Sequence, residues 1–384
     1  MALDSDTLNQ LVDTVEKFVE NRLRPLESQV GAEDRIPDDV VTEMKELGFF
    51  GLTIPEEYGG MGLNMSEEVA VVRAFGRTSP AFRSLFGTNV GIGSQALVID
   101  GTEAQKQQYL PGMATGEIIG SFCLTEPDAG SDAASVKLTA KKDGDEYVLN
   151  GTKRYITNAP KAHLLTVFAR TDMSQAGARG VSAFLVDARS DGISLGQPYR
   201  KMGQQGTYVC DVMFDDVRVP AENIVGGREN VGFATAMKVL DKGRLHISAL
   251  SVGVAERLID DSVRYALERE QFGQAIAEFQ LIQSMLARSQ TEMFAAWCMV
   301  QEVARRRDAG ENVAALAASC KLFATEMVGK VADNAVQIHG GAGYVEDYGI
   351  ERFYRDVRLF RIYEGTSEIQ QTVIAKDMLR RAGS

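Results

Sequence analysis

The sequence keeps its strand-like runs apart from its helical patterns, and this separation most restricts the possible fold. Between residues 120 and 225, short apolar runs are separated by turn dipeptides such as Asp143-Gly144 and Asn150-Gly151, which is typical of β-hairpins. The stretches before and after carry apolar residues at helical spacing. Because helices and strands do not alternate, we predict an α+β fold and not a parallel α/β sheet.

The same pattern predicts three domains. We expect an N-terminal helical domain over residues 1–119, a central antiparallel β domain over 120–228 and a C-terminal four-helix bundle over 229–384. The individual elements predicted are helices at 37–47, 66–75, 102–109 (ending at Pro111), 233–240, 245–268, 279–307 and 313–338, and strands at 147–149, 164–169, 181–186 and 209–214. Asn150-Gly151 is expected to form a hairpin turn after the first of these strands.

Composition excludes several classes of function. The formal net charge is −12, which argues against nucleic acid or an anionic membrane surface as the main partner. Four well-separated cysteines and three histidines make no metal-binding spacing, so no metal site is expected. The acidic, polar start does not resemble a targeting peptide, and no apolar run reaches the roughly 18 residues that span a bilayer. We therefore expect a cytoplasmic protein without membrane insertion.

Six segments combine hydroxyl, acidic and glycine residues in a fixed order. They are residues 121–132 (SFCLTEPDAGSD), 150–157 (NGTKRYIT), 201–203 with 211–223 (KMG, DVMFDDVRVPAEN), 268–273 (EREQFG), 337–341 (QIHGG) and 363–369 (YEGTSEI). Each segment alone is also compatible with an ordinary polar loop. Together they resemble the acyl-CoA dehydrogenase family over nearly the whole chain, in agreement with the helical, β, helical layout.

The resemblance implies an FAD-dependent oxidoreductase that converts an acyl-CoA thioester to the 2-enoyl-CoA and passes electrons to an electron-transfer flavoprotein. FAD would be bound noncovalently across a subunit boundary in a homotetramer, a dimer of dimers. Residues implied around the flavin ring are Phe122, Leu124, Thr125, Ser131, Tyr155, Ile156 and Thr157, with Thr366 and Glu368 closing the site. A neighbouring subunit would supply Arg269, Gln271, Phe272, Gln280, Gln337, Gly340 and Gly341 to the pyrophosphate and adenine side.

Glu364 is the candidate catalytic base. Removal of a weakly acidic α-proton, while hydride leaves the β-carbon for flavin N5, requires a desolvated base with a raised pKa. The family resemblance allows this base at two positions, and the other is Gly243, which has no side chain. Gly365 lets the thioester approach the backbone, and the N–H of Glu364 is implied to bind the thioester oxygen. Ser367, with Gln370 three residues on, is expected to cap the helix that follows.

Four residues besides Gly365 are candidates for substrate binding. Asp241 and Arg244 match the family's contacts to the pantetheine and nucleotide arms of CoA, although an i, i+3 ion pair explains them equally well. Ser131 is expected to contact both flavin and substrate. Arg83 resembles the arginine with which glutaryl-CoA dehydrogenases bind the distal carboxylate of the substrate. It could also correspond to an arginine that faces a sulfinate, as in the desulfinase branch of the family. The second polar contact expected there is missing at Gly87, and a surface ion pair is the alternative for Arg83.

Other functions fit the sequence less well. An acyl-CoA oxidase usually carries an additional C-terminal helical region, and a nitroalkane oxidase uses aspartate as its base. A non-catalytic flavoprotein module would have lost the base, which is present as Glu364. Residues 91–96 (GIGSQA) match a dinucleotide-binding fingerprint, but no strand precedes them, so a nucleotide fold is rejected. The length and branching of the acyl group and the physiological electron acceptor are not determined by the sequence.

Overall fold

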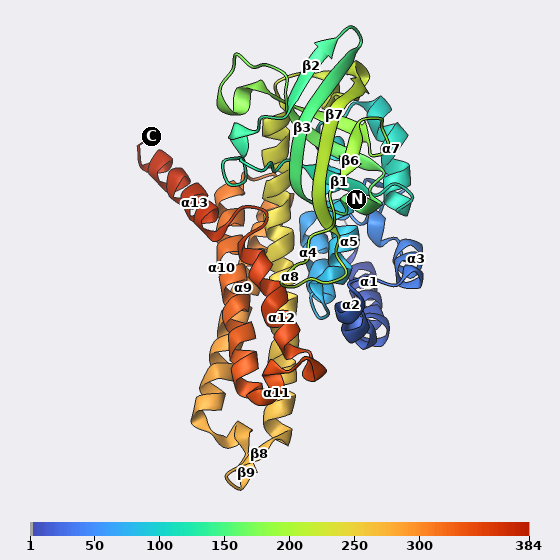
Figure 1. The fold of residues 1–384 in the computed structure, drawn as a ribbon. Helices are drawn as coiled ribbons and strands as arrows, with labels where there is room; N and C mark the ends of the chain where they lie inside the picture. Colours follow the sequence, from blue (N-terminus) through green and yellow to red (C-terminus); the bar gives the residue numbers. More distant parts are fainter. Residues whose placement is uncertain (1–2, 384) are drawn as a thin grey trace.

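A mixed β-sheet lies across one end of a long helical bundle, and the N-terminal helices pack beside both (Figure 1). The protein is described by a computed structural model that covers residues 3–383. This arrangement confirms the predicted α+β fold with a helical, a β and a helical region in chain order. None of the helices within residues 3–383 is both long enough and apolar enough to cross a membrane.

The N-terminal region is helical, as predicted. Its α-helices are α1 (Ser5–Phe18), α2 (Glu27–Glu33), α3 (Asp38–Glu46), α4 (Met65–Phe75), α5 (Pro80–Thr88), α6 (Gln95–Asp100) and α7 (Glu103–Thr115). The prediction that α7 ends at Pro111 was wrong, because the helix continues through the proline to Thr115. A proline removes only one backbone donor, and burial of Leu110, Met113 and Ala114 holds the last turn in place.

The middle region forms a twisted sheet in the order β1-β4-β2-β3-β7-β6, with β5 paired to β4. The strands are β1 (Gly120–Cys123), β2 (Thr139–Asp143), β3 (Glu146–Thr157), β4 (Leu164–Arg170), β5 (Val181–Asp187), β6 (Ile193–Leu195) and β7 (Val209–Pro220). Most pairs are antiparallel, as predicted, but β1 and β2 each pair with β4 in parallel. Parallel pairing is possible because β2 and β3 lie between β1 and β4 in the chain and provide a long crossover.

One predicted turn is part of a strand. Asn150-Gly151 lies inside the long strand β3, where the register against β7 shifts between Leu149 and Gly151. Gly151 has a φ of 142°, and its missing side chain leaves room for Leu138. The dipeptide therefore makes a β-bulge, whereas Asp143-Gly144 makes the predicted turn between β2 and β3.

The C-terminal region is a helical bundle built around one very long helix. Its elements are α8 (Gly232–Glu268), the hairpin β8 (Glu270–Gln271) and β9 (Gln274–Ala275), α9 (Gln280–Asp308), α10 (Ala314–His339), α11 (Gly341–Tyr344), α12 (Ile350–Val357) and α13 (Ser367–Ala382). The prediction of two helices before residue 268 was wrong. Residues 241–244, which the prediction left between the two helices, are helical: Lys242 pairs with Glu68 and Arg244 with Asp241, so the helix continues through them.

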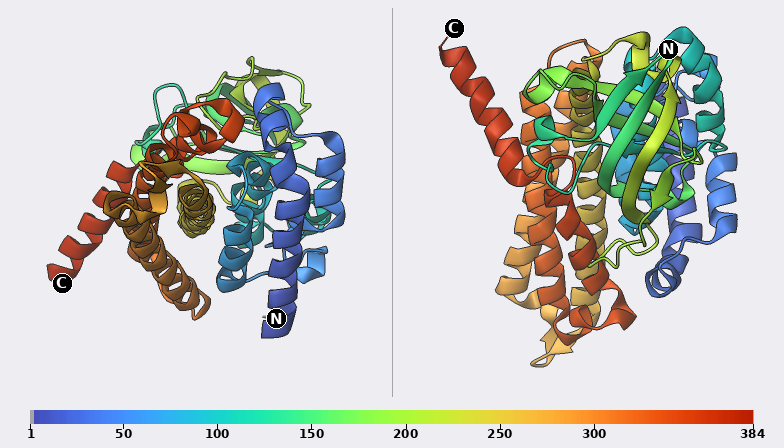
Figure 2. Two further views of the ribbon diagram at one scale, coloured as in Figure 1. Left: turned by 90° about the horizontal axis from the view of Figure 1, so that it is seen from below. Right: turned by 45° about the horizontal axis from the view of Figure 1, so that its top comes forward.

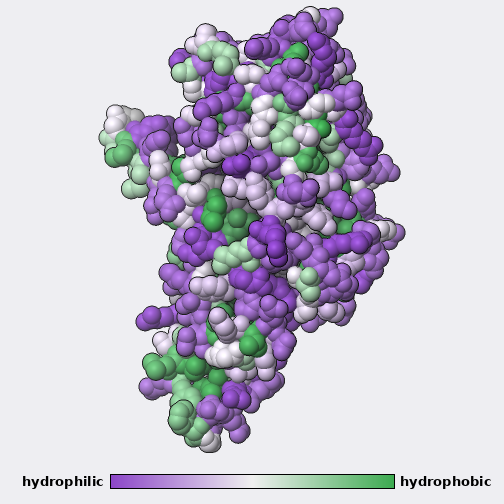
Figure 3. Space-filling model, in the orientation of Figure 1, coloured by the Kyte–Doolittle hydropathy of each residue, from purple (hydrophilic) through white to green (hydrophobic). Residues whose placement is uncertain are grey.

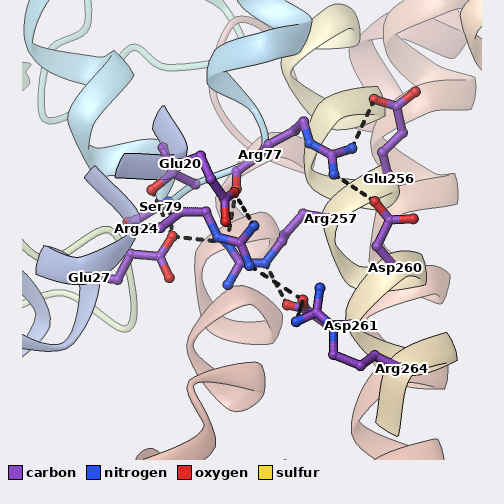
Figure 4. A network of polar contacts seen from close by, with 11 residues as sticks. Glu20, Arg24, Glu27, Arg77, Ser79, Glu256, Arg257, Asp260, Asp261 and Arg264 are labelled. Atoms are coloured by element: carbon purple, nitrogen blue, oxygen red, sulfur yellow. Dashed lines mark hydrogen bonds and ion pairs between the residues drawn. The ribbon is translucent and has the colours of Figure 1, made fainter. Parts of the chain in front are cut away.

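A network of ion pairs joins the N-terminal helices to α8 (Figure 4). Arg77 contacts Asp260, and Arg257 donates to the backbone oxygen of Arg77 at 2.9 Å. Glu27 accepts hydrogen bonds from the hydroxyl of Thr78 and the backbone N–H of Ser79, directly before α5 begins. These contacts fix the start of α5 against α8, so that side chains from the two helices can meet at a defined distance.

Candidate active site

A cavity of about 350 Å³ lies where the sheet, α5, α8 and the loop before α13 meet. Many of the residues predicted for cofactor and substrate binding line it. They are Arg83, Phe122, Leu124, Thr125, Ser131, Tyr155, Ile156, Thr157, Arg244, Glu364 and Gly365. These residues come from all three regions of the chain, which shows that the cavity exists only in the folded protein.

Glu364 lies in a strained loop whose backbone carbonyls are hydrogen-bonded by the side chains of Lys321 and Gln370. Its φ of 55° places a non-glycine residue in the left-handed region, at a cost of about 1–2 kcal/mol. Lys321 of α10 donates to the backbone oxygen of Gly365 at 2.7 Å, and the amide of Gln370 donates to both loop carbonyls. With these carbonyls held inward, the backbone N–H of Glu364 has no partner within residues 3–383.

The carboxylate of Glu364 has the properties of a base. The residue as a whole is partly accessible, but its Oε2 is buried and has no hydrogen-bond partner among the described residues. Desolvation raises the pKa of Glu364, while the nearby charges of Arg83, Lys321 and Arg244 oppose this rise. A Cβ at Gly243 would lie 1.7 Å from Oε2. Side chains at the two positions considered for the base would therefore occupy the same part of the cavity. Because residue 243 is a glycine, the carboxylate of Glu364 fits there.

The helix after this loop begins differently from the prediction. Thr366, and not Ser367, is the N-cap of α13, because its extended backbone lets its hydroxyl accept from the N–H of Ile369. The Ser367 hydroxyl instead donates to Glu326 at 2.6 Å. Thr366 and Glu368 lie beside the cavity but do not line it, and the helix backbone N–H groups lower the pKa of exposed Glu368.

The opposite wall of the cavity suits a flat aromatic group with polar edges. Apolar Phe122 and Leu124 stand beside the hydroxyl residues Thr125 and Thr157. The hydroxyl of Thr207, which lines the same cavity, is buried without a partner in the described chain. Such a mixture of apolar surface and unpaired polar atoms fits the ring of FAD, with its apolar face and its rim of carbonyl oxygens and nitrogens.

A buried ion pair supports this wall. Lys153 of β3 is fully buried, and its ammonium donates to the backbone oxygen of Leu124 at 3.0 Å and to Glu126 at 2.8 Å. Arg154 donates its backbone N–H to the oxygen of Thr125 at 2.8 Å. These contacts hold the loop after β1 against β3, and so fix the residues expected around the flavin ring.

The residues predicted to come from a neighbouring subunit lie at the far end of the bundle, at the bottom of Figure 1. They are Arg269, Gln271, Phe272, Gln280, Gln337, Gly340 and Gly341, in and around the β8–β9 hairpin and the α10–α11 junction. Phe272 is 94% exposed. A single chain therefore does not bring this group to the cavity that contains Glu364.

Asp241 and Arg244 form the ion pair that was one of the two explanations for them, with 2.5 Å between charged atoms. Arg244 also lines the cavity, and its Nε is buried without a partner among the described residues. Burial raises the pKa of Asp241. The pair therefore leaves Arg244 able to meet a ligand, whereas Asp241 mainly orients it.

The alternative for Arg83, an ion pair on a helix surface, was wrong. Arg83 is only 5% exposed, and its Nε donates to Nε2 of His246 at 2.6 Å. Nδ1 of His246 lies 2.6 Å from Glu68, which in turn lies 3.3 Å from the ammonium of Lys242. Sequence reasoning missed all three partners, as well as Lys321. The one available signal was that Lys242 directly precedes Gly243 and that His246 lies two residues after Arg244.

Comparison with known proteins agrees with this geometry. Residues 5–117, 121–217 and 230–379 match the N-terminal, middle and C-terminal domains of acyl-CoA dehydrogenases. The chain is 43% identical to a 3-(aryl)acrylate reductase of Clostridium sporogenes, covering 94% of this chain and 96% of the relative. It is 41% identical to subunit CarC of the caffeyl-CoA reductase-Etf complex of Acetobacterium woodii, covering 92% and 93%.

A solved structure gives the same result. Butyryl-CoA dehydrogenase from Megasphaera elsdenii superposes with a TM-score of 0.94 at 33% identity, covering 99% of this chain and all of that one. The similarity extends through the sheet, the bundle and the loop that carries Glu364. The resemblance seen in the sequence is thus confirmed, and the chain belongs to the acyl-CoA dehydrogenase family of FAD-binding oxidoreductases that act on CH–CH bonds.

Proposed function

We propose that Glu364 removes the α-proton of an acyl-CoA thioester bound in the cavity, giving the 2-enoyl-CoA. The observation that carries this role is the position of its Oε2, which is buried, unpartnered in the described chain and directly against Gly243. Desolvation raises the pKa of the carboxyl, which makes the carboxylate a stronger base. The charges of Arg83 and Lys321 oppose this rise in pKa and so favour the ionised carboxylate.

The same loop supplies the proposed hydrogen-bond donor for the thioester oxygen. Negative charge develops on this oxygen as the α-proton leaves, and a fixed backbone donor stabilises it. The N–H of Glu364 has no acceptor among the described residues and can make this contact, while Lys321 and Gln370 hold the carbonyl of Gly365. The FAD implied by the family supplies the acceptor for the hydride that leaves the β-carbon. Thr125, Ser131 and Thr157 are the proposed contacts to its polar edge, and Phe122 and Ile156 the proposed contacts to its ring.

We further propose that the site is completed by a second copy of the chain in a homotetramer. The residues expected at the pyrophosphate and adenine lie at the far end of the bundle, where Figure 3 shows a hydrophobic area of the surface. Leu267 and Phe272, at the end of α8 and in the hairpin that follows it, are exposed. Helix α13 projects away from the rest of the chain (Figure 2) and exposes Met378 and Leu379. Surfaces of this kind are covered in an assembly.

An electron-transfer flavoprotein is the proposed redox partner. The relative from Acetobacterium woodii is a subunit of a complex that contains Etf, which supports this assignment. Three of the similar proteins have reductase in their names, so the reverse reaction is the second candidate. In that direction Glu364 returns a proton to the α-carbon. The ratio of rates in the two directions, measured with one thioester pair and a dye of known potential, tells the candidates apart.

The substrate is proposed to have an acidic acyl tail. Arg83 lines the cavity and no carboxylate within residues 3–383 pairs with it, which leaves its charge available to a succinyl- or glutaryl-type thioester. A carboxylate in this position also allows decarboxylation after the oxidation, whereas a sulfinate there allows hydrolytic release of sulfite, in which water attacks the sulfur, the carbon takes up a proton and no electrons are passed on. Analysis of the product for loss of CO₂ or sulfite separates these outcomes.

Anaerobic bleaching of the bound flavin tests the proposed function. Wild type should be bleached by at least one thioester in a panel of neutral and dicarboxylyl-CoA compounds, and Glu364→Gln should retain FAD but not be bleached. A flavin that no thioester reduces would support the alternative of a non-catalytic flavoprotein module. Comparing reoxidation by air with reoxidation by dye separates a dehydrogenase from an oxidase.

A further inference from the structure

The side chain of Arg83 reaches its position only because Gly87, one turn later on α5, has no side chain. A Cβ at Gly87 would lie 2.4 Å from Nε and 2.9 Å from Cζ of Arg83. Any larger residue at 87 would force the arginine into another rotamer. Gly87 cannot make the hydroxyl contact expected at this position. It instead leaves the space through which the guanidinium of Arg83 crosses α5 to reach His246 of α8.

The imidazole of His246 receives this guanidinium in a defined tautomer. Arginine can only donate, so Nε2 of His246, 2.6 Å away, is the acceptor. The ring proton is then on Nδ1, which donates to Glu68 at 2.6 Å. Burial and the charge of Arg83 lower the pKa of His246 to about 4, so the ring is neutral near pH 7. Both side chains behind Arg83, His246 and Glu68, are completely buried.

This arrangement leaves the charge of Arg83 incompletely compensated. The only hydrogen bond of its guanidinium within the described residues goes to a neutral ring, while Glu68 is shared between His246 and Lys242. A buried guanidinium without an anionic partner is costly, and its remaining N–H groups form a planar edge that matches a carboxylate. Glu364 and Glu68 act on this charge only without direct contact, so the planar edge of Arg83, which lines the cavity, remains able to pair with an anionic group of the ligand.

We propose that His246, oriented by Glu68, is a positioning residue that holds the planar edge of Arg83 toward the acyl tail and thereby sets a preference for anionic tails. The inference rests on the proposed function, in which an acyl thioester occupies this cavity. Without the imidazole, the guanidinium is free to turn toward Glu68 and pair with it directly. The tail would then lose its partner although Arg83 is still present.

The test compares two thioesters of equal length, one with a terminal carboxylate and one with a neutral end. In wild-type holoenzyme, kcat/KM should favour the acidic thioester, and His246→Phe should reduce this ratio by about tenfold or more, mainly through KM. Turnover of the neutral thioester should stay within about threefold. His246→Gln, whose amide can accept from Arg83 and donate to Glu68, should restore most of the ratio.

Two further variants distinguish the loss of the positioning contact from a general folding defect. Gly87→Ala displaces Arg83 without changing His246, and should reduce the same ratio. Ser251→Ala removes a buried hydroxyl of α8 whose single hydrogen bond among residues 3–383 goes to the backbone oxygen of Ile247, and should leave the ratio unchanged. Equal losses for both thioesters in His246→Phe, or an unchanged ratio in both His246→Phe and Gly87→Ala, would overturn the proposal.

A binding measurement separates this proposal from the proposed function. The dissociation constant of a redox-inert thioether analogue of dicarboxylyl-CoA should rise about tenfold in His246→Phe, whether or not the enzyme oxidises any thioester. Wild type that is bleached equally well by acidic and neutral thioesters would remove the role of His246 and leave the role of Glu364 intact. Wild type that binds the analogue through Arg83 but is bleached by nothing would refute the dehydrogenase reaction alone.

Discussion

Replacement of Gly243 by alanine tests the position of the base without altering the base itself. The new Cβ would lie 1.7 Å from Oε2 of Glu364, whereas ordinary contacts are about 3.4 Å or longer. The carboxylate must therefore move by somewhat more than 1 Å. A displacement of this size at a reacting group can cost about 10²-fold in rate, which is about 2.7 kcal/mol of barrier.

The assay is anaerobic reduction of the bound flavin by stopped flow with a saturating thioester. Gly243→Ala should reduce flavin about 10²-fold more slowly than wild type, with the same FAD content and an unchanged or slightly higher melting temperature, because alanine favours the helix. Gly329→Ala is the matched control, since it lies within α10 and its Cβ meets only the side chain of Arg361, at 3.4 Å. A rate for Gly243→Ala within twofold of wild type would refute the placement of Glu364 as the base.

The site and the ion pair that supports its wall allow four other predictions. Glu364→Gln should lower flavin reduction by about 10³-fold with FAD retained, and near-normal turnover would rule Glu364 out as the base. The acid limb of kcat should lie at a higher pH than for an ordinary glutamate, because burial raises the pKa of Glu364. Lys321→Met should move that limb further up by removing a charge that lowers this pKa, and a downward shift would contradict the electrostatics. Lys153→Met should lower the free energy of unfolding by about 3 kcal/mol in urea titrations, because it leaves Glu126 buried without its cation. Lys137→Met, which breaks only an exposed pair, should change it by less than about 0.5 kcal/mol.

The tertiary contacts explain why α8 can carry both charges and chemistry. Lys242, Gly243, Arg244 and His246 are all buried in a helix that otherwise packs alanine, valine and leucine. Lys242 and His246 meet Glu68 from α4, and Arg244 meets Asp241 one turn earlier. Each buried charge thus has a partner, which is the condition under which such residues are tolerated in a core.

The sequence by itself determined the features that depend on local pattern and motif order. The separation of strand runs from helical periods predicted the α+β fold, and six segments in order identified the family. Comparison of two positions, one occupied by glycine, singled out Glu364. These inferences succeed because a hydrophobic period and a short motif are read from neighbouring residues in the chain.

Only the tertiary structure decided how the charged residues are used. Arg83 and His246 are 163 positions apart, and Glu68 is 178 positions from His246, so no local pattern connects them. Local pattern left a surface ion pair open as the alternative for Arg83, and it predicted two helices where α8 is continuous. Whether a charge is solvated or buried depends on partners from distant segments, and such partners become adjacent only when the three regions pack together.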